Sequence, residues 1–537
     1  MFVGDRNRIE LSSSNFKDFI INGCLYVDKT AFIEHVIKDS SNVLLFTRPR
    51  RMGKSLNMNT LATFLNCKQD TAHLFKDLYI EKSSVFSEIN KYPVIYFSFK
   101  DYNADNYKQE IRDEIIQLIE KYLKPEQFGR ILTRYLNDDD DYSPTILKRL
   151  MEVLSDVYGK NPYILIDEYD KPIFDNMSHT NFAEMKTYLV TLLSSSMKDN
   201  PYLGKAILTG VTRIAKENLF SGLNNIVVYD TMKPSVYDAD FSLTDEELLE
   251  LVAADKIAGV RQWYNNMRVG GNLLYNIYSV MNYLSDPAAG LKGYWTRTGN
   301  QKILGELLNS ERLDEIVRMV NGNYFLETIL DPQLNMEHLK DGTKCSDISF
   351  YTLGVQAGYL SHNHIGHDTY EIFVPNEEAK RTWARLILDY RYDSPDSKLR
   401  EIFKGIQDID LFSSKLTDFT SMRLSYYDIG DGLEKTYHVF SLGLYIGADY
   451  ECVSNLEAGL GRFDILLKAK TFNAIIEFKV SDSATDDALN KEADKALIQI
   501  EEREYWRAVK DSQLPLYKIG IACHGKKCLV KTVLRDK

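Results

Sequence analysis

Residues 42–55 read Asn-Val-Leu-Leu-Phe-Thr-Arg-Pro-Arg-Arg-Met-Gly-Lys-Ser, and this stretch decides the fold of the N-terminal part of the chain. The apolar run from Val43 to Phe46 has the length of a buried strand, and the pattern predicts a helix from Gly53 to about Leu65. Backbone N–H groups at such a helix N-terminus face a bound phosphate, and Gly53 lets the backbone approach it closely. The stretch therefore predicts a phosphate-binding loop between a strand and a helix.

The residues of this loop have expected roles at a bound nucleotide. Lys54 would reach the β- and γ-phosphates, and Ser55 would offer its hydroxyl to Mg²⁺. The general pattern opens with a glycine where this chain has Arg48, so the loop is strongly basic. An inactive phosphate loop is therefore an alternative that a nucleotide-binding assay would test. The residues we expect to bind nucleotide here are Arg50, Arg51, Met52, Gly53, Lys54 and Ser55.

A second element, Tyr163-Ile-Leu-Ile-Asp-Glu-Tyr-Asp170, runs from apolar residues into carboxylates. A carboxylate at a strand end can hold the Mg²⁺ shell, a role that we assign to Asp167. The adjacent Glu168 is placed to polarise the attacking water. The alternative is a buried strand that ends in a solvated acidic turn.

A third element, Lys205-Ala-Ile-Leu-Thr-Gly-Val-Thr-Arg213, places polar groups after another apolar run. Thr209 ends the strand, where a polar residue can sense the γ-phosphate. Arg213 can stabilise transition-state charge in cis or in trans. The alternative is a plain strand and turn with a surface arginine.

Short apolar strands alternate with helical stretches through this first part of the chain. Strands separated by helices indicate a parallel α/β sheet, here that of a P-loop NTPase domain over residues 1–234. Besides 42–47, the expected strands are residues 92–99, 162–166, 205–209 and 226–229.

From about residue 235 the pattern becomes mostly helical. A capping-box pattern with Ser242 or Thr244 as N-cap begins the first of these helices. We expect a mostly helical middle domain over residues 235–375 that ends in a small winged or hairpin element. Its two short strands are predicted at residues 350–361 and 369–375.

Residues 376–537 return to an α/β pattern and form the third expected domain. Apolar positions at helical spacing predict an amphipathic helix over about 487–509, and an earlier helix is expected near 436–445. The predicted strands are residues 462–468, 473–480, 516–522 and 527–533, with one more at 450–454.

The C-terminal strands carry charges inside apolar runs. Glu477 and Lys479 project from the same strand face because side chains alternate along a strand. If Asp464 faces them from an antiparallel neighbour, Asp464 and Glu477 can share Mg²⁺, which prefers oxygen ligands. The metal would activate water toward a phosphodiester, Lys479 would stabilise developing charge, and Gln499 would reach the rim of the site. The alternative is a Glu477–Lys479 ion pair on a solvated strand face.

Several of these motifs together resemble the AAA-ATPase-like proteins of bacteria. That family typically has Arg-Pro-Arg-Arg before its Gly-Lys-Ser, so Arg48 departs from the general pattern but matches the family's own. The motifs that carry the resemblance are Arg48–Ser55, Asp167–Asp170, Leu208–Arg213, Phe220–Asn225, Phe19 through Tyr26–Thr30, Trp263-Tyr-Asn-Asn and Tyr275–Ser279.

The C-terminal pattern of Asp464, Glu477-Phe-Lys479 and Gln499 resembles the PD-(D/E)XK nuclease superfamily. Glu434 is a loose candidate for the earlier acidic residue of that family. The two resemblances imply an N-terminal P-loop NTPase sheet and a C-terminal restriction-endonuclease-like α/β domain. They also imply ATP and Mg²⁺ as cofactors and a nucleic acid, preferentially DNA, as partner.

The composition limits the classes of protein that fit. The 537 residues contain 65 Lys and Arg against 77 Asp and Glu, a formal net charge of -12 that argues against a generally basic nucleic-acid coat. Six cysteines are too sparse for a disulfide scaffold and indicate a reducing compartment. No secretory signal and no apolar run long enough to span a bilayer are found, so we expect a cytoplasmic protein without a membrane partner.

Two further clusters have a metal-binding alternative. His362, His364 and His367 lie in a polar loop that we interpret as a hairpin, with Zn²⁺ or Ni²⁺ binding as the other interpretation. Cys523 and Cys528 flank Gly525, and we interpret them as another hairpin, with a partial zinc site as the alternative.

The leading hypothesis is a nucleotide-regulated nuclease-like protein, an ATPase coupled to a metal-dependent nuclease. The alternative from another class is a nucleotide-gated switch or scaffold, whose C-terminal fold binds nucleic acid or protein without cleaving it. Assembly into a homo-oligomer is left open, because Arg213 can act across a subunit interface as well as in cis.

Overall fold

The computed structural model describes residues 2–124, 126, 143–214, 225–265, 267–295, 301–321, 324–334, 339, 345–392, 396–423, 451–454, 457–458, 461–509, 512–525 and 527–535. The chain divides into two compact units. Unit 1 comprises residues 1–300 and 327–379, and unit 2 comprises residues 301–326 and 380–537. The three domain boundaries expected from the sequence stay predictions.

Unit 1 contains the predicted parallel sheet. Its strand order is β4–β5–β6–β3–β7, and all neighbouring strands are parallel. The strands are β3 (Val43–Thr47), β4 (Val94–Ser98), β5 (Tyr163–Asp167), β6 (Lys205–Gly210) and β7 (Ile226–Tyr229). Every residue of β3, β5 and β6 is buried, which explains their continuous apolar runs. This confirms the α/β fold class.

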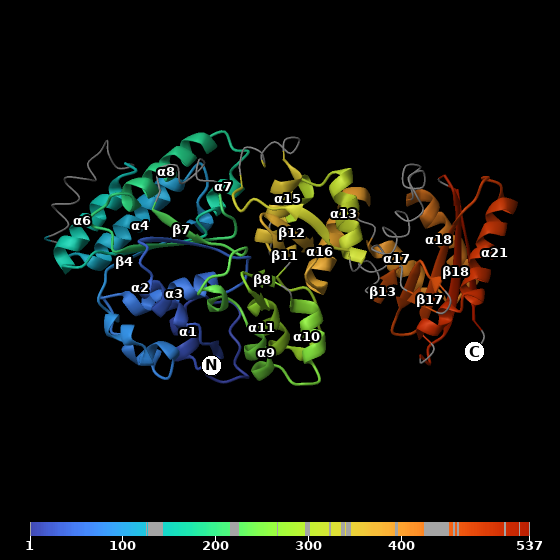
Figure 1. Ribbon diagram of the computed structural model, residues 1–537, viewed down its shortest axis with the longest axis horizontal. Helices are drawn as coiled ribbons and strands as arrows, with labels where there is room; N and C mark the ends of the chain where they lie inside the picture. The colour runs from blue at the N-terminus through green and yellow to red at the C-terminus, as the bar shows by residue number, and fades with distance from the viewer. Residues whose placement is uncertain are drawn as a thin grey trace. The chain divides into compact units, whose positions relative to one another are not determined.

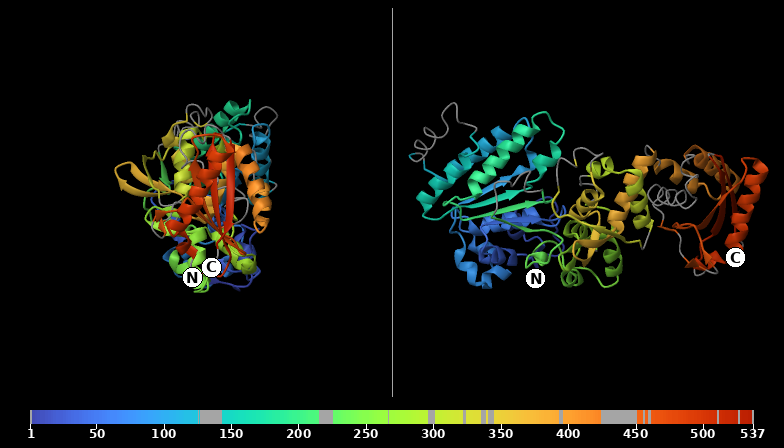
Figure 2. Two further views of the ribbon diagram at one scale, coloured as in Figure 1. Left: turned by 90° about the vertical axis from the view of Figure 1, so that its right-hand side faces the viewer. Right: turned by 45° about the horizontal axis from the view of Figure 1, so that its top comes forward.

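Helices cover both faces of this sheet. One face is covered by α1 (Phe16–Ile21), α2 (Ala31–Lys38) and α3 (Lys54–Leu65) (Figure 1). The other face carries α4 (Tyr107–Tyr122), α6 (Ile146–Tyr158) and α8 (Phe182–Met197) (Figure 2). The loops that follow β3, β5 and β6 lie at the carboxyl edge of the sheet. Ligands of parallel α/β sheets bind at this edge.

The segment after the sheet is helical, as predicted. Thr244 caps α9 (Asp245–Leu251) in a capping box with Glu247, so Thr244, and not Ser242, is the N-cap. The Ser242 hydroxyl instead donates to the carbonyl of Tyr275. The segment also contains α10 (Ile257–Tyr264), β8 (Met267–Val269), β9 (Asn272–Leu274) and α11 (Ile277–Ser285).

Three short elements come earlier in the chain. They are β1 (Phe2–Val3), β2 (Tyr26–Val27) and α7 (Lys171–Asp175).

The strand predicted at residues 350–361 is wrong. Residues 347–356 form the helix α15 (Asp347–Gln356), which Ser346 caps by accepting the Ser349 N–H. All residues from Phe350 to Gln356 are buried, so the helix has no polar face and its sequence shows no helical periodicity. The expected hairpin is confirmed as β11 (Ser361–Gly366) paired with β12 (Thr369–Phe373).

Unit 2 contains a mixed sheet of order β13–β16–β17–β18–β19, in which only β17 and β18 are parallel. Its strands confirm the five C-terminal predictions: β13 (Glu451–Ser454), β16 (Ile465–Lys468), β17 (Asn473–Val480), β18 (Leu516–His524) and β19 (Lys527–Leu534). Unit 2 also contains α12 (Gln301–Glu306), α13 (Ser310–Asn321), α17 (Asp396–Lys404), α18 (Ile409–Arg423), β14 (Glu457–Ala458) and β15 (Gly461–Arg462). The strand β10 (Leu326–Ile329) instead pairs with β12 in a three-stranded sheet of order β10–β12–β11, and the helix α16 (Glu377–Tyr392) includes residues of both units.

The long C-terminal helix is shorter than predicted. α21 (Asp486–Glu502) ends before Glu504, which has a φ of 54°, and a 3₁₀ turn follows at Tyr505–Val509. α21 packs closely on β18, because a Cβ added at Gly520 would lie 2.4 Å from the Ala493 carbonyl oxygen. The helix expected near 436–445 lies outside the described residues.

The hairpin expected around Gly525 is confirmed by the pairing of β18 with β19. Cys523 and Cys528 occupy opposed positions across it and form a disulfide. Both cysteines are buried in a core with Leu416 of α18. The low cysteine content did not predict this bond.

Candidate functional sites

The loop after β3 joins a buried strand to the helix α3. Gly53 precedes α3 with a φ of 84°, a conformation that favours glycine. Lys54 begins the helix, and its Nζ donates to the carbonyl oxygens of Arg48 at 2.9 Å and Pro49 at 2.8 Å. The side chain of Lys54 thus binds the backbone at the start of its own loop. Ser55 is the next residue of the helix and is half-buried.

Lys54 is a buried ammonium beside an acidic turn. Burial lowers its pKa to about 8, while the nearby carboxylates of Asp167, Asp170 and Glu168 act in the opposite direction. The lysine therefore keeps its charge near neutral pH. A buried cation of this kind can attract the phosphates of a nucleotide.

The acidic turn after β5 is tied to the end of β6. Asp167 is buried and accepts hydrogen bonds from the Thr209 hydroxyl and from the Glu168 N–H. Asp170 accepts from the Thr212 hydroxyl at 2.7 Å and from the Thr212 N–H at 2.8 Å. Gly210 permits this approach, since a Cβ there would lie 2.6 Å from the Asp170 carboxylate. The predicted Mg²⁺ ligand and the predicted γ-phosphate sensor are therefore in direct contact.

Glu168 has the environment of a proton acceptor. Its pKa is raised, first by burial and then by the neighbouring Asp167, while Lys54 and Arg50 oppose the shift. Its backbone φ is 54°, an uncommon conformation for a residue with a side chain. Such strain is typical of functional turns.

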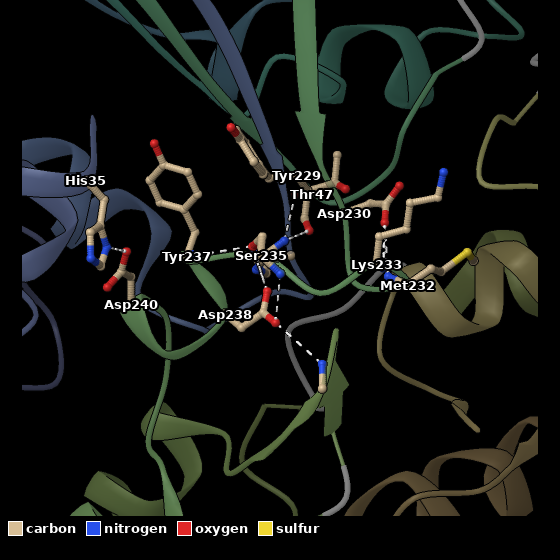
Figure 3. A network of polar contacts seen from close by, with 12 residues as sticks. His35, Thr47, Tyr229, Asp230, Met232, Lys233, Ser235, Tyr237, Asp238 and Asp240 are labelled. Carbon is tan, nitrogen blue, oxygen red and sulfur yellow. Dashed lines mark hydrogen bonds and ion pairs between the residues drawn. The ribbon is translucent and has the colours of Figure 1, made fainter. Parts of the chain in front are cut away.

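Arg48 lies at the position of the missing glycine, and its side chain is fully buried. Its guanidinium donates to the carbonyl oxygens of Thr47 at 2.9 Å and Tyr229 at 2.7 Å. It also lies 3.9 Å from the Asp238 carboxylate and 5.1 Å from the centre of the Phe241 ring. Figure 3 shows three of these partners, Thr47, Tyr229 and Asp238. Arg48 thus joins the loop to the segment after β7.

The other predicted loop residues differ in what they can offer a nucleotide. Met52 is fully buried, so only its backbone can contact a phosphate. The Arg51 guanidinium lies 4.4 Å from the centre of the Tyr278 ring. Arg50 carries its charge close to both Lys54 and Glu168, and its carbonyl accepts from the Asn276 amide. The loop therefore presents Arg50 and Lys54 as its nearest cations to the acidic turn.

Arg213 is held at the next strand end. Its guanidinium donates to Asp230 at 3.2 Å, and its backbone N–H donates to the Gln356 side chain at 3.1 Å. Its predicted role at a nucleotide stays a prediction.

The upstream motif Tyr26–Thr30 has structural contacts. Asp28 accepts hydrogen bonds from Thr30 and from the Tyr79 N–H, and Lys29 forms an ion pair with Glu247 at 2.7 Å. The motif joins distant segments of unit 1. The Phe220–Asn225 motif lies largely outside the described residues.

Two strands bring the C-terminal carboxylates together. The antiparallel register places Ile465 opposite Ile476, so that Asp464 lies beside Glu477. The Phe478 N–H donates to the Asp464 carboxylate at 2.7 Å, and the Asp464 N–H donates to the Glu477 carboxylate at 3.4 Å. The geometry that the sequence left conditional is therefore present.

Lys479 and Gln499 complete a hydrogen-bonded cluster with these carboxylates. Lys479 Nζ lies 3.3 Å from Glu477 Oε1 and 2.6 Å from Gln499 Oε1. Gln499 Nε2 donates to the same Glu477 oxygen and, at 3.2 Å, to the Tyr505 hydroxyl. Gln499 thus contacts the centre of the cluster, closer than the rim position expected from the sequence.

The cluster is suited to a divalent cation. Glu477 is 3% exposed, and burial together with the adjacent Asp464 raises its pKa to about 7, against the opposing effect of Lys479. Two neighbouring carboxylates in a dry environment repel each other, and a hard cation with oxygen ligands relieves that repulsion. Asp464 and Glu477 therefore fit Mg²⁺ or Mn²⁺.

Tyr505 was missed by the sequence analysis. It is buried, and the nearby charges of Glu477 and Asp464 help raise its pKa after the larger effect of burial. Gly461 approaches it, since a Cβ there would lie 3.3 Å from its hydroxyl. Its position just after the helix that carries Gln499 could have indicated that Tyr505 lies near the cluster. Glu434 lies outside the described residues.

The histidine cluster offers no metal site where the chain is described. Among those residues, no group of three or more His, Cys, Asp or Glu side chains is arranged to hold a metal ion. His362 is buried in β11, and the His364 ring instead lies 2.6 Å from the carbonyl oxygen of His367.

Comparison with known proteins supports the two halves separately. Residues 10–220 match the family described as predicted AAA-ATPase, and residues 432–533 match the PD-(D/E)XK nuclease superfamily. The chain is 25% identical over 523 residues to an uncharacterized protein in the vnfD 5′ region of Azotobacter chroococcum mcd 1, with 92% of each chain covered. The chain thus combines an AAA-ATPase-like domain with a nuclease-superfamily domain. No helix in the described ranges is long and apolar enough to cross a membrane.

Proposed function

Taking an AAA-ATPase-like domain joined to a PD-(D/E)XK domain as the premise, we propose that this chain couples ATP binding and hydrolysis to metal-dependent cleavage of a nucleic-acid phosphodiester, preferentially in DNA. The observation that carries the proposal is the cluster of Asp464, Glu477, Lys479 and Gln499, in which a buried carboxylate lies beside a second one and a lysine.

In the N-terminal half, Lys54 and Arg50 would bind the phosphates of ATP. The buried Asp167 and the Ser55 hydroxyl would hold the Mg²⁺ that accompanies the nucleotide. Glu168, whose pKa is raised, would take a proton from the attacking water. The Thr209 hydroxyl, which now donates to Asp167, would sense the γ-phosphate.

In the C-terminal half, Asp464 and Glu477 would hold a divalent cation. When bound, that ion supplies charge stabilisation on the phosphodiester and lowers the pKa of a water molecule. Lys479 would stabilise negative charge on the phosphate oxygens, and Gln499 would fix Lys479 and Glu477 relative to each other. This division of roles requires an ionised Glu477, whose pKa is raised by burial and by Asp464 when no metal is bound. Protons therefore compete with the cation, and the metal concentration needed for half-maximal cleavage should fall as the pH rises.

The test is cleavage of single- and double-stranded DNA and RNA by the full chain, with Mg²⁺ or Mn²⁺ and with or without ATP. We expect metal-dependent cleavage that is lost in Asp464→Ala, and an ATP effect that is lost in Glu168→Ala. Lys495→Ala is the matched control, because this exposed lysine lies on the same helix as Gln499 but pairs with Glu492. Cleavage that persists in Asp464→Ala would contradict the proposal.

ATP binding is measured separately with the same chain. Lys54→Ala should abolish binding of a fluorescent ATP analogue, and unchanged affinity would contradict the nucleotide half. The other outcome, intact ATP binding without cleavage of any substrate, favours the nucleotide-gated binding module. That module is suggested by the acidic balance of the chain, with a net charge of -12.

A further inference from the structure

Asp230 follows β7 at the edge of the sheet where the phosphate loop begins. Phe46 of β3 is paired with Tyr229 of β7, and Thr47 of β3 is paired with Gly210 of β6. The end of β3 therefore lies between the end of β7 and the end of β6. We propose that Asp230 is the positioning residue for Arg213, which it anchors beside the phosphate loop; this inference rests on the proposed ATPase function.

The carboxylate of Asp230 is a rigid anchor. It is 2% exposed, and its Oδ1 accepts the N–H groups of Met232 at 3.0 Å and Lys233 at 3.2 Å. These contacts are visible in Figure 3. Its other oxygen, Oδ2, accepts from the Arg213 guanidinium at 3.2 Å. Because the backbone fixes one oxygen, the other presents the arginine with an acceptor of defined position.

The backbone of Arg213 is fixed as well. Its N–H donates to the Gln356 side chain, and its carbonyl accepts the Leu334 N–H at 2.9 Å. The side chain keeps 18% of its surface exposed, whereas Asp230 is buried. A long arginine side chain with both ends held loses little further freedom when it binds a phosphate. This arrangement serves an arginine that must meet a ligand in one geometry.

The charges next to Asp230 have partners of their own. Asp230 also acts on the Arg48 guanidinium, but Asp238 has the larger effect and lies 3.9 Å from it, and Arg48 donates its hydrogen bonds to backbone carbonyl oxygens. Asp240 is paired with His35 at 2.8 Å. Among these three aspartates of the segment after β7, Asp230 is the partner of Arg213.

A double-mutant cycle on ATP hydrolysis tests the inference. Asp230→Asn keeps an oxygen for the Met232 and Lys233 N–H groups but removes the charge that holds Arg213. We expect kcat to fall about 10- to 100-fold, because a misplaced charged group loses its transition-state contribution, while KM changes little. In the Arg213→Ala background, Asp230→Asn should cause no further loss, because the two residues act as a unit.

A second readout and two further variants separate positioning from a general structural effect. The preference for a fluorescent ATP analogue over the matching ADP analogue should fall equally in Asp230→Asn and Arg213→Ala. Asp245→Asn is the control, since it breaks an Arg–Asp pair with Arg261 elsewhere in unit 1 and should leave turnover unchanged. If Asp230→Asn does not fold, Asp230→Glu keeps the charge, displaces the guanidinium and should give an intermediate loss.

Two results would overturn the inference while the proposed function stands. One is unchanged turnover in Asp230→Asn, and the other is an equal loss in the Arg213→Ala background, which indicates a structural role. A wild-type chain that binds no nucleotide would instead overturn the proposed ATPase function, and this inference with it.

Discussion

Lys479 Nζ lies 2.6 Å from Gln499 Oε1, so the lysine of β17 is held by a residue of α21 as well as by Glu477 on its own strand. The same glutamine donates to Glu477. Gln499 therefore fixes the separation between the cation and the carboxylate that the proposed chemistry uses. The position of a helix, and not the strand alone, sets the geometry of the cluster.

Replacing Gln499 by Ala should lower metal-dependent cleavage about 10- to 100-fold, because Lys479 and Glu477 would lose their common partner. Thermal unfolding should change little, since the side chain lies at the half-buried edge of α21. Initial cleavage rates at saturating Mg²⁺ measure the effect, with Lys495→Ala as control. Wild-type rates in Gln499→Ala would show that the hydrogen bonds are incidental.

Gly520→Ala should displace α21. Gly520 is paired with Glu477 across β17 and β18, and an added Cβ would lie 2.4 Å from the Ala493 carbonyl oxygen. We expect a loss of about 1–3 kcal/mol in the free energy of unfolding and a loss of cleavage, because Gln499 moves with the helix. Denaturant unfolding checks this, with Gly271→Ala as the control, where an added Cβ would meet nothing within 4 Å.

The sequence predicted the strands well where burial leaves a clear pattern. β3, β5 and β6 are fully buried runs of apolar residues, and their polar ends carry Asp167 and Thr209. α15 was predicted as a strand because burial on all sides removes the helical period.

The contacts made by distant residues were beyond the reach of local patterns. The sequence predicted the contact between Asp464 and Glu477 only on the condition that their two strands are antiparallel neighbours. A short turn between two strands favours that pairing, but the sequence does not fix the register. Asp230 carries no local motif, and the fold brings it to Arg213, whereas Tyr505 lies only six residues after Gln499 and was missed because no motif marks it. Arg48 was correctly noted as a departure from the general pattern, but its burial against Asp238 depends on a segment far along the chain.

Buried His362 predicts a pH-dependent stability of unit 1. Burial lowers its pKa to about 4, and nearby Arg268 and His364 add to the shift. In the unfolded chain the imidazole protonates near its ordinary pKa of about 6.5. Between these values the unfolded state binds more protons, so the free energy of unfolding should fall as the pH drops from about 6.5 to 4.

Denaturant unfolding at several pH values tests this effect of His362, which amounts to at most about 3 kcal/mol. His362→Gln should be less stable at pH 7 and should lose part of the slope below pH 6.5. His73→Gln is the control, because this exposed histidine of unit 1 is not among the groups that shift the pKa of His362. An identical slope in His362→Gln would assign the pH dependence to other groups.

Glu168→Gln should separate ATP binding from ATP hydrolysis. The amide has nearly the same shape but cannot take a proton from water, so hydrolysis should fall about 100-fold or more. Affinity for ATP should stay the same or rise, because a carboxylate beside Asp167 and the phosphates is removed. Single-turnover hydrolysis and equilibrium binding measure the two effects, and unaltered hydrolysis would remove Glu168 from the proposed mechanism.

Arg48→Gly restores the general phosphate-loop pattern and should nevertheless destabilise the protein. The substitution removes a fully buried guanidinium, leaves Asp238 without its nearest cation and frees the carbonyl oxygens of Thr47 and Tyr229. We expect a loss of about 3 kcal/mol in the free energy of unfolding, together with weaker ATP binding from a loop that is no longer attached to the segment after β7. Denaturant unfolding and ATP binding test both effects, with exposed Arg51→Ala as the stability control. If the Arg48→Gly protein is stable and binds ATP more tightly, Arg48 weakens nucleotide binding and does not stabilise the phosphate-binding loop.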